Sequence, residues 1–333
     1  MKKRMLTLAL AALMGLGLLA GCGSEPAAQE PDAAPDAADT PVDSGAPAGD
    51  KKVIAIVPKT LNNPFFVAMV DNAKASCEAL GWEVKVNAAD AETEVDKQIS
   101  ILEAFIEEGV DAIITGPSSK TALVDVINKA DAKGIPVFLV DSGADECAYK
   151  TYIGTDNYIG GQLGAKWIGE NVKAGQVAVL DGFSGNDATT QRQKGFMDEI
   201  ANYPDIEVVA SEYGNCEISK GMEVTENFLV AYPELKGIFT VNDMMAIGAG
   251  QAVEAAGKRD SILICGFDGQ PDAAQKIIDG TIDATIAQKP ATMGKLIVQS
   301  VADYFDGKEI ERTVDTGCDV VNADNAAEYL EWH

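Results

Sequence analysis

Short apolar runs alternate with longer helical patterns along most of the chain. Apolar, largely β-branched runs of strand length occupy residues 53–57, 83–86, 112–114 and 137–140. Helical patterns separate these runs, at 64–80, at about 92–108 and over a segment that ends near Gly134. Such alternation, with strands that are apolar throughout, is typical of a parallel sheet covered by helices on both faces.

A second series of the same kind begins at residues 152–154. Its predicted strands are 177–180, 206–210, 238–241, 262–265 and 282–287. Its predicted helices are 157–172, 188–201, 217–231, 243–256 and 271–279. Two series of strand and helix predict an α/β fold built from two doubly wound, Rossmann-like lobes.

The N-terminus carries an export signal. Lys2, Lys3 and Arg4 precede the apolar stretch 5–20, which is shorter than the roughly 20 residues of a membrane-spanning helix. We therefore expect a signal peptide over residues 1–21. The stretch ends in Leu-Ala-Gly-Cys, which resembles the lipobox of bacterial lipoproteins and implies a lipidated Cys22. The alternative is an ordinary signal peptide that ends near a cysteine.

Residues 23–50, which follow Cys22, have the composition of a disordered tether. They contain eight alanines, five prolines and seven acidic residues, but no lysine, arginine or aromatic residue. Such a segment cannot bury enough apolar surface to offset the entropy lost on folding. We expect it to hold the folded body away from the membrane.

The charge balance limits the kinds of partner. The whole chain carries −26, with +3 from residues 1–21 and −7 from residues 23–50, which leaves −22 on the body from Lys51 onward. A body this acidic argues against nucleic acid as a partner, because nucleic-acid binding needs a basic footprint. It also disfavours docking on anionic lipid, so we expect membrane attachment only through the lipid anchor.

Five cysteines remain besides Cys22, at positions 77, 147, 216, 265 and 318. They are scattered, form no CxxC pair and are odd in number. We expect free, packed thiols rather than a disulfide framework, and the sequence shows no metal-ligand spacing.

Polar and aromatic residues gather in the loops that follow the predicted strands. In open parallel sheets ligands bind beyond the carboxyl ends of the strands. The loops there are 59–66, 116–117, 141–142, 181–182, 242–243 and 266–269. Their carboxylates and amides pair with hydroxyl groups, and their aromatic rings suit the apolar face of a pyranose. The pattern favours an uncharged, polyhydroxylated ligand.

Four segments resemble the ribose-binding protein and its pentose- and hexose-binding relatives: TLNNPFF at 60–66, NDMMAIGA at 242–249, GFDG at 266–269 and ATIAQ at 284–288. The similarity runs in order over about residues 52–315. It implies the type I periplasmic binding protein fold, with three hinge crossings near 154–157, 288–290 and 312–314. The N-terminal lobe would then comprise 51–154 plus 289–312, and the C-terminal lobe 155–288 plus 313–333.

The resemblance also implies a set of sugar-binding residues, namely Asn63, Phe65, Phe66, Asp141, Arg192, Asn242, Phe267, Asp268 and Gln288. Three positions depart from the ribose-binding pattern. Ser142 stands in place of an arginine, Gly116 in place of an asparagine, and Cys216 in place of an aromatic residue. These changes indicate a ligand other than β-ribopyranose, such as a hexose or a polyol.

Three further candidates follow from these departures: Lys59, Ser142 and Tyr213. We expect Lys59 to return a positive donor to the cleft from a different wall, although a solvent-facing lysine is the alternative. Gly116 and Cys216 are expected to open space, and Tyr213 to replace the missing aromatic ring.

Several of these residues also have purely structural interpretations. Asn63 precedes Pro64, which is the pattern of a helix N-cap followed by proline at the first helical position. Of the neighbours Phe65 and Phe66, one is expected in the core and the other in the cleft. At the later strand end, Asp243 is expected as the N-cap and Asn242 as the ligand contact.

The sequence thus predicts an extracytoplasmic lipoprotein on the outer face of the cytoplasmic membrane. It would capture a small sugar or polyol for an ABC permease, as a monomer without a cofactor. A receptor subunit for chemotaxis or autoinducer signalling is the alternative. An enzyme is disfavoured, because the only histidine is His333 and no phosphate-binding loop is present. The sequence leaves open one type of enzyme site, a pair of catalytic carboxylates as in glycosidases.

Overall fold

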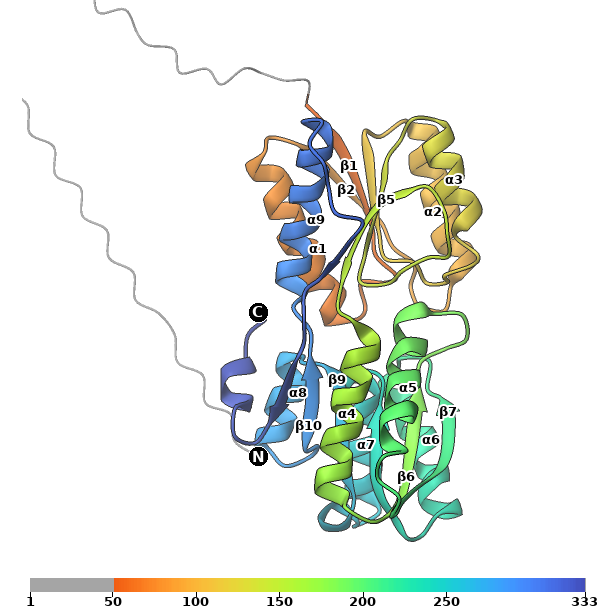
Figure 1. The fold of residues 1–333 in the computed structure, drawn as a ribbon, viewed down its shortest axis with the longest axis vertical. Coiled ribbons are helices and arrows are strands. Elements are labelled where there is room, and N and C mark those ends of the chain that lie inside the picture. Colours follow the sequence, from red (N-terminus) through yellow and green to blue (C-terminus); the bar gives the residue numbers. More distant parts are fainter. Residues whose placement is uncertain (1–50, 333) are drawn as a thin grey trace, which may run out of the picture. The chain divides into compact units, whose positions relative to one another are not determined.

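The computed structural model describes residues 51–332, which fold into two α/β lobes (Figure 1). The predicted signal peptide, the lipidated Cys22 and the tether lie outside the described residues. Each lobe is built around one six-stranded sheet, as the two series of strands and helices predicted.

The first lobe has the strand order β11-β5-β4-β3-β1-β2, with every pair parallel. Its strands are β1 (Val53–Val57), β2 (Glu83–Val86), β3 (Ala112–Thr115), β4 (Val137–Val140), β5 (Tyr149–Gly154) and β11 (Thr313–Asp315). Helices α1 (Pro64–Ala79) and α9 (Pro290–Phe305) pack together on one face (Figure 1). Helices α2 (Val95–Glu108) and α3 (Val124–Ala132) cover the other.

The second lobe has the order β12-β10-β9-β8-β6-β7, and only β12 is antiparallel to its neighbour. Its strands are β6 (Gly175–Asp181), β7 (Ile206–Tyr213), β8 (Leu235–Thr240), β9 (Leu263–Asp268), β10 (Ala284–Ala287) and β12 (Asp319–Asn322). Its helices are α4 (Asn157–Val172), α5 (Asp187–Ile200), α6 (Ile218–Ala231), α7 (Asp243–Ala255) and α8 (Pro271–Ile278). Two short 3₁₀ turns, Arg259–Ser261 and Ala326–Tyr329, complete it.

Two glycines bring α4 and α5 unusually close together. A Cβ atom at Gly161 would lie 2.1 Å from the carbonyl oxygen of Arg192, and one at Gly195 would lie 2.0 Å from that of Tyr158. Both distances are far inside van der Waals contact, so only glycine permits this approach. The close packing fixes the backbone of Arg192 relative to α4.

The structure corrects the predicted third crossing. Because β11 pairs with β5, residues 313–315 belong to the first lobe, and the chain crosses only between Asp315 and Asp319. The last described residues also return to the first lobe, where the Trp332 ring lies 6.2 Å from that of Phe65. Assigning 313–333 to the second lobe was therefore wrong at both ends. The other two crossings lie between the end of β5 and the start of α4, and between the end of β10 and the start of α9.

Residues 51–332 contain no helix that is long and apolar enough to cross a membrane. All five cysteines in this part of the chain are free: Cys77, Cys216 and Cys265 are buried, and Cys147 and Cys318 are partly buried.

Candidate functional site

The carboxyl ends of the strands in the two lobes face one another across a small cavity, which we call the inner cavity. Twelve residues line it: Lys59, Asn63, Phe65, Phe66, Glu92, Asp141, Ala188, Thr189, Arg192, Cys216, Asn242 and Asp268. The fold thus brings together eight residues that were candidates from the sequence. Its free volume is about 20 Å³, close to the room for one water molecule.

On the first lobe, the inner cavity is built around a buried ion pair. Lys59 follows β1 and Asp141 follows β4, and their Nζ and Oδ2 atoms are 2.8 Å apart. Both side chains are 3 % exposed, so the solvent-facing alternative for Lys59 is wrong. The same ammonium group lies 5.4 Å from the centre of the Phe66 ring, within the range of a cation–π interaction.

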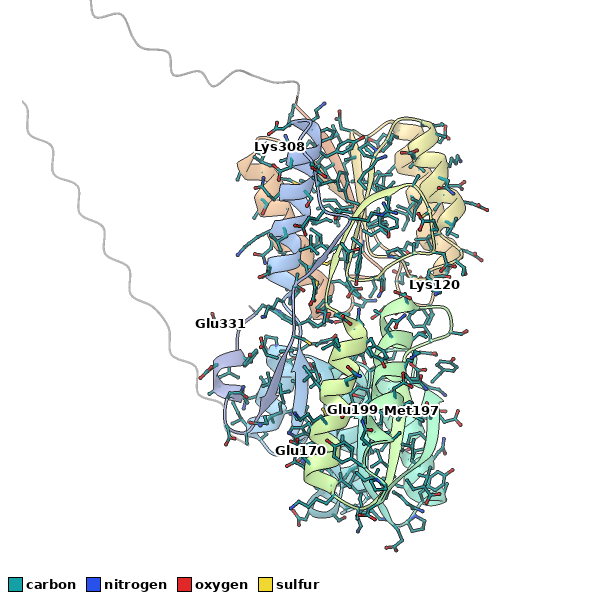
Figure 2. All side chains as sticks on the ribbon, viewed as in Figure 1. Lys120, Glu170, Met197, Glu199, Lys308 and Glu331 are labelled. Carbon is teal, nitrogen blue, oxygen red and sulfur yellow. The ribbon has the colours of Figure 1, made fainter. Side chains whose placement is uncertain are left out.

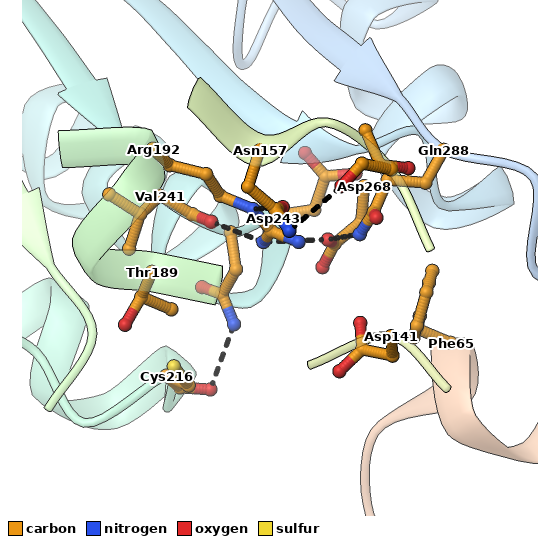
Figure 3. Close-up of polar contacts among 12 residues, drawn as sticks. Phe65, Asp141, Asn157, Thr189, Arg192, Cys216, Val241, Asp243, Asp268 and Gln288 are labelled. Carbon is orange, nitrogen blue, oxygen red and sulfur yellow. Dashed lines mark hydrogen bonds and ion pairs between the residues drawn. The ribbon is translucent and has the colours of Figure 1, made fainter. Parts of the chain in front are cut away.

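On the second lobe, Arg192 of α5 organises the polar groups (Figure 3). Its Nε donates to Asn157 Oδ1 at 2.7 Å, and one terminal nitrogen donates both to the Val241 carbonyl at 2.8 Å and to Asp268 Oδ1 at 3.2 Å. The guanidinium lies 3.9 Å from the centre of the Phe267 ring. Asp268 Oδ1 also accepts a hydrogen bond from Gln288 Nε2 at 2.7 Å.

Asn63 connects the two lobes directly. Its Oδ1 caps α1 by accepting from the Phe65 amide at 3.0 Å, as the proline after it predicted. The same oxygen accepts from Gln270 Nε2 of the second lobe at 3.2 Å, and Asn63 Nδ2 donates to Glu92 at 3.2 Å. A ligand larger than a water molecule can enter the inner cavity only if such contacts open.

A second direct contact between the lobes involves Lys120, which Figure 2 labels. Its backbone amide donates to the carbonyl of Gly185 at 3.0 Å, and its Nζ lies 3.9 Å from Asp187. Both Lys120 and Asp187 are partly exposed, so this ion pair contributes little to stability.

Backbone strain is concentrated around the inner cavity. Among the described residues, five that are not glycine have positive φ, and four of them belong to this region: Asp141 (67°), Asn215 (54°), Cys216 (62°) and Asp268 (127°). Positive φ is unfavourable for side chains with a Cβ and persists only where the surrounding structure enforces it. The packing of both lobes therefore offsets the backbone strain that holds these polar residues in place.

Three carboxyl groups and two cations share the inner cavity. Burial is the main cause that raises the pKa of Glu92 to about 7, and the nearby Lys59 ammonium and Asn63 amide oppose this rise. Burial also raises the pKa of Asp268, although Arg192 opposes it. When Glu92 is protonated, the two remaining carboxylates balance Lys59 and Arg192. A neutral ligand suits such a site, because it leaves the balance unchanged.

We expect the pH dependence of stability to report Glu92. Because its pKa rises from 4.5 in the unfolded chain to about 7, folding favours the protonated acid, and this stabilisation is full below pH 4.5 and lost as pH rises through 7. Glu92→Gln, which cannot ionise, should therefore be more stable than wild type at pH 8 by about 3 kcal/mol, and similar at pH 4.5. Urea unfolding at both pH values measures the difference.

Glu226→Gln on α6 is the matched control, because Glu226 is exposed. It should follow the wild-type pH profile. If Glu92→Gln follows the wild-type profile as well, Glu92 does not titrate in the way its burial implies.

The structure gives Asn242 both of the roles that were divided between it and Asp243. Asn242, not Asp243, is the N-cap of α7: its Oδ1 accepts from the Met245 amide at 3.0 Å while its Nδ2 donates to the Cys216 carbonyl at 3.3 Å. Asp243 is fully buried below the site and is held by Thr285 Oγ1 at 2.6 Å. The expected capping role of Asp243 was wrong, and Asn242 both caps α7 and lines the inner cavity.

Other candidates support the site without lining the inner cavity. Phe267 and Gln288 contact Arg192 and Asp268 from behind. Ser142 is fully buried beside Asp141. Tyr213 is 51 % exposed and lies in a separate surface hollow beside α6, so it does not replace the missing aromatic ring.

Gly116 does not open space, contrary to the expectation from sequence. A Cβ atom there would lie 2.9 Å from the backbone oxygen of Val140, so this glycine permits close packing of β3 and β4. Cys216, in contrast, does line the inner cavity.

Sequence reasoning missed Glu92, Gln270 and Asn157. Glu92 lies six residues after β2 ends and carries no motif, so only its position in the fold reveals it. Within residues 51–332 we find no group of three or more His, Cys, Asp or Glu side chains able to hold a metal ion.

The sequence is similar to those of known binding proteins. Residues 54–309 match the family described as periplasmic binding protein domain. The ribose import binding protein of Bacillus subtilis is 36 % identical over 269 residues, covering 80 % of this chain and 86 % of that protein. The D-allose-binding periplasmic protein of Escherichia coli is 32 % identical over 258 residues, covering 75 % and 83 %.

A solved structure of a solute-binding protein has a similar fold. An ABC transporter periplasmic solute-binding protein from Actinobacillus succinogenes with bound D-allose superposes with a TM-score of 0.79 at 35 % identity, covering 84 % of this chain and all of that one. These proteins are named as binding proteins rather than as enzymes, in agreement with the lack of catalytic motifs in this sequence.

Proposed function

This chain belongs to the periplasmic binding protein family, and from that premise we propose that it binds a small neutral sugar or polyol for an ABC importer. The observation that carries the proposal is the inner cavity, where the two lobes face one another. Each lobe contributes a buried ion pair and an amide side chain, and α1 of the first lobe adds two phenylalanine rings. Carboxylates and amides accept and donate hydrogen bonds to hydroxyl groups, and the rings suit the apolar face of a sugar.

A sugar would act by bridging the lobes. Residues after β1 and β4 would bind it from one side, and Arg192, Asn242 and Asp268 from the other. A ligand that contacts both lobes stabilises the conformation in which they are close, and a membrane permease distinguishes that conformation from the open one.

A thermal-unfolding panel on the purified protein tests this proposal. The probes are D-ribose, D-allose, D-galactose and myo-inositol, together with glycosides of the three sugars and two disaccharides. A true ligand at 100 times its Kd stabilises the native state by about 2.7 kcal/mol, which raises the Tm measurably. Recovery of the ligand unchanged excludes turnover. If no neutral sugar or polyol raises the Tm, the proposed function is wrong.

The lipid anchor is part of the same proposal. It is supported by the basic start, the apolar stretch and the Leu-Ala-Gly-Cys ending of residues 1–22. Attachment to the outer face of the cytoplasmic membrane through diacylated Cys22 would keep the protein near its permease.

We expect Cys22→Ser to abolish incorporation of labelled palmitate and to release the protein from the membrane fraction or leave it unprocessed. Cys147→Ser is the control, because Cys147 is a free thiol within the folded body, and it should behave as wild type. Equal labelling of Cys22→Ser and wild type would refute the anchor.

A further inference from the structure

A second, larger cavity adjoins the inner cavity, and we call it the outer chamber. Its volume is about 650 Å³, within the usual range for small-molecule sites. The two cavities share Asn63, Glu92 and Cys216 as lining residues. The two cavities are therefore direct neighbours, with these three side chains at their boundary.

The walls of the outer chamber differ in character. Ile218 and Met222 of α6 and Met244 of α7 form an apolar wall on the second lobe. Thr60, Asn62 and Asp90 form a polar wall on the first lobe. A sugar ring has the matching asymmetry, with an apolar face and an edge of hydroxyl groups. Methionine also adapts to ligands of irregular shape.

The polar wall is fixed by its own hydrogen bonds. The Asp90 carbonyl accepts from Asn62 Nδ2 at 2.6 Å and from Thr60 Oγ1 at 3.1 Å. The Asp90 carboxylate, in contrast, makes no hydrogen bond to any of the residues from 51 to 332, and neither does the amide of Gln251 on the opposite side. Both groups are therefore available to a ligand.

The charge of the outer chamber limits what it accepts. The carboxylates of Asp90 and Glu217 line it, and none of its lining residues is Lys, Arg or His. Repulsion between like charges disfavours a phosphate or a carboxylate in this chamber. The substituent it accepts should be neutral.

A strained loop lies at the boundary between the two cavities. Asn215 and Cys216 are consecutive residues with φ of 54° and 62°, before α6 begins. The loop places the small Cys216 side chain at the junction, where it is 6 % exposed. Any large ring at position 216 would fill the space that joins the cavities.

We propose that the outer chamber is a second subsite, and that the ligand is a sugar carrying a neutral, ring-sized substituent, such as a disaccharide or a glycoside. The inference rests on the proposed function, because the inner cavity has to bind the sugar ring first. A second subsite also explains why an apolar wall from α6 and α7 faces a polar wall across the outer chamber.

Calorimetry with matched pairs of probes tests the subsite. D-Allose, D-galactose and D-glucose are each compared with their phenyl β-glycosides, and lactose and cellobiose are added. We expect at least one substituted sugar to bind 10-fold or more tightly than its parent monosaccharide. If every parent binds as tightly as its substituted forms, the subsite is refuted.

Variants that fill the outer chamber provide a second test of the subsite. Ser219→Trp on α6 and Gln251→Phe on α7 place rings in it from two exposed positions, with Ser219→Ala as the matched control. Each filling variant should weaken the substituted sugar 10-fold or more and leave its parent within 2-fold. Equal effects on both sugars, or no effect on either, would overturn the subsite while leaving the inner cavity intact. If no probe binds wild type at all, the sugar-binding function itself fails.

Discussion

Asp268→Ala is expected to lower sugar affinity by 10-fold or more and to destabilise the protein. Asp268 lines the inner cavity and accepts hydrogen bonds from Arg192 and Gln288. Loss of a hydrogen bond to a charged group costs about 1.5–3 kcal/mol of binding free energy. The variant also leaves Arg192, which is 4 % exposed, without its carboxylate, and uncompensated buried charges cost about 3–5 kcal/mol of stability. Calorimetry and urea unfolding measure the two effects.

Two controls separate these effects. Asp71→Ala on α1 removes an exposed carboxylate that takes part in no ion pair within residues 51–332, and it should change neither quantity. Asp268→Ala combined with Arg192→Met removes both charges. The double variant should therefore lose less unfolding free energy than the sum of the losses in the two single variants. Its affinity should stay low. Wild-type affinity in Asp268→Ala would remove this residue from the site.

Lys59→Met is expected to be destabilising to a similar extent. The substitution leaves Asp141 buried with no ammonium group at 2.8 Å, again at a cost of about 3–5 kcal/mol. It also removes a donor from the inner cavity, so we expect the affinity for the true ligand to fall about 10-fold. Urea unfolding and calorimetry at pH 7 measure both.

The same strand offers a matched comparison. Lys52, next to β1, pairs with Asp111 at 3.2 Å, but both side chains are 34 % exposed. An ion pair of that exposure contributes about 0–1 kcal/mol, so Lys52→Met should have little effect on stability or affinity. Similar results for the two variants would show that burial of the Lys59–Asp141 pair has no energetic consequence.

The sequence by itself determined the architecture. Apolar runs and helical patterns are local properties, and they predicted the elements from β1 to β10 within a few residues. The strand-end rule pointed to the loops that hold Lys59, Asp141, Asn242 and Asp268, and the resemblance to the ribose-binding family implied that the loops of both lobes form one site.

The elements after β10 had no such local signal. Helix α9 and strands β11 and β12 were not predicted as elements, and β11 was placed in the wrong lobe. Three residues of β11 pair with β5 more than 150 positions earlier, and a pairing of that range leaves no pattern in the strand itself.

The chemistry of the inner cavity was decided only by the tertiary structure. Whether Lys59 faces solvent or Asp141 depends on two strand ends 82 residues apart. The elevated pKa of Glu92 depends on burial by parts of both lobes. Gly116 was misread because the atom that excludes its Cβ belongs to the neighbouring strand β4. Composition and periodicity describe one segment at a time, whereas burial, pairing and pKa arise where segments distant in sequence come into contact.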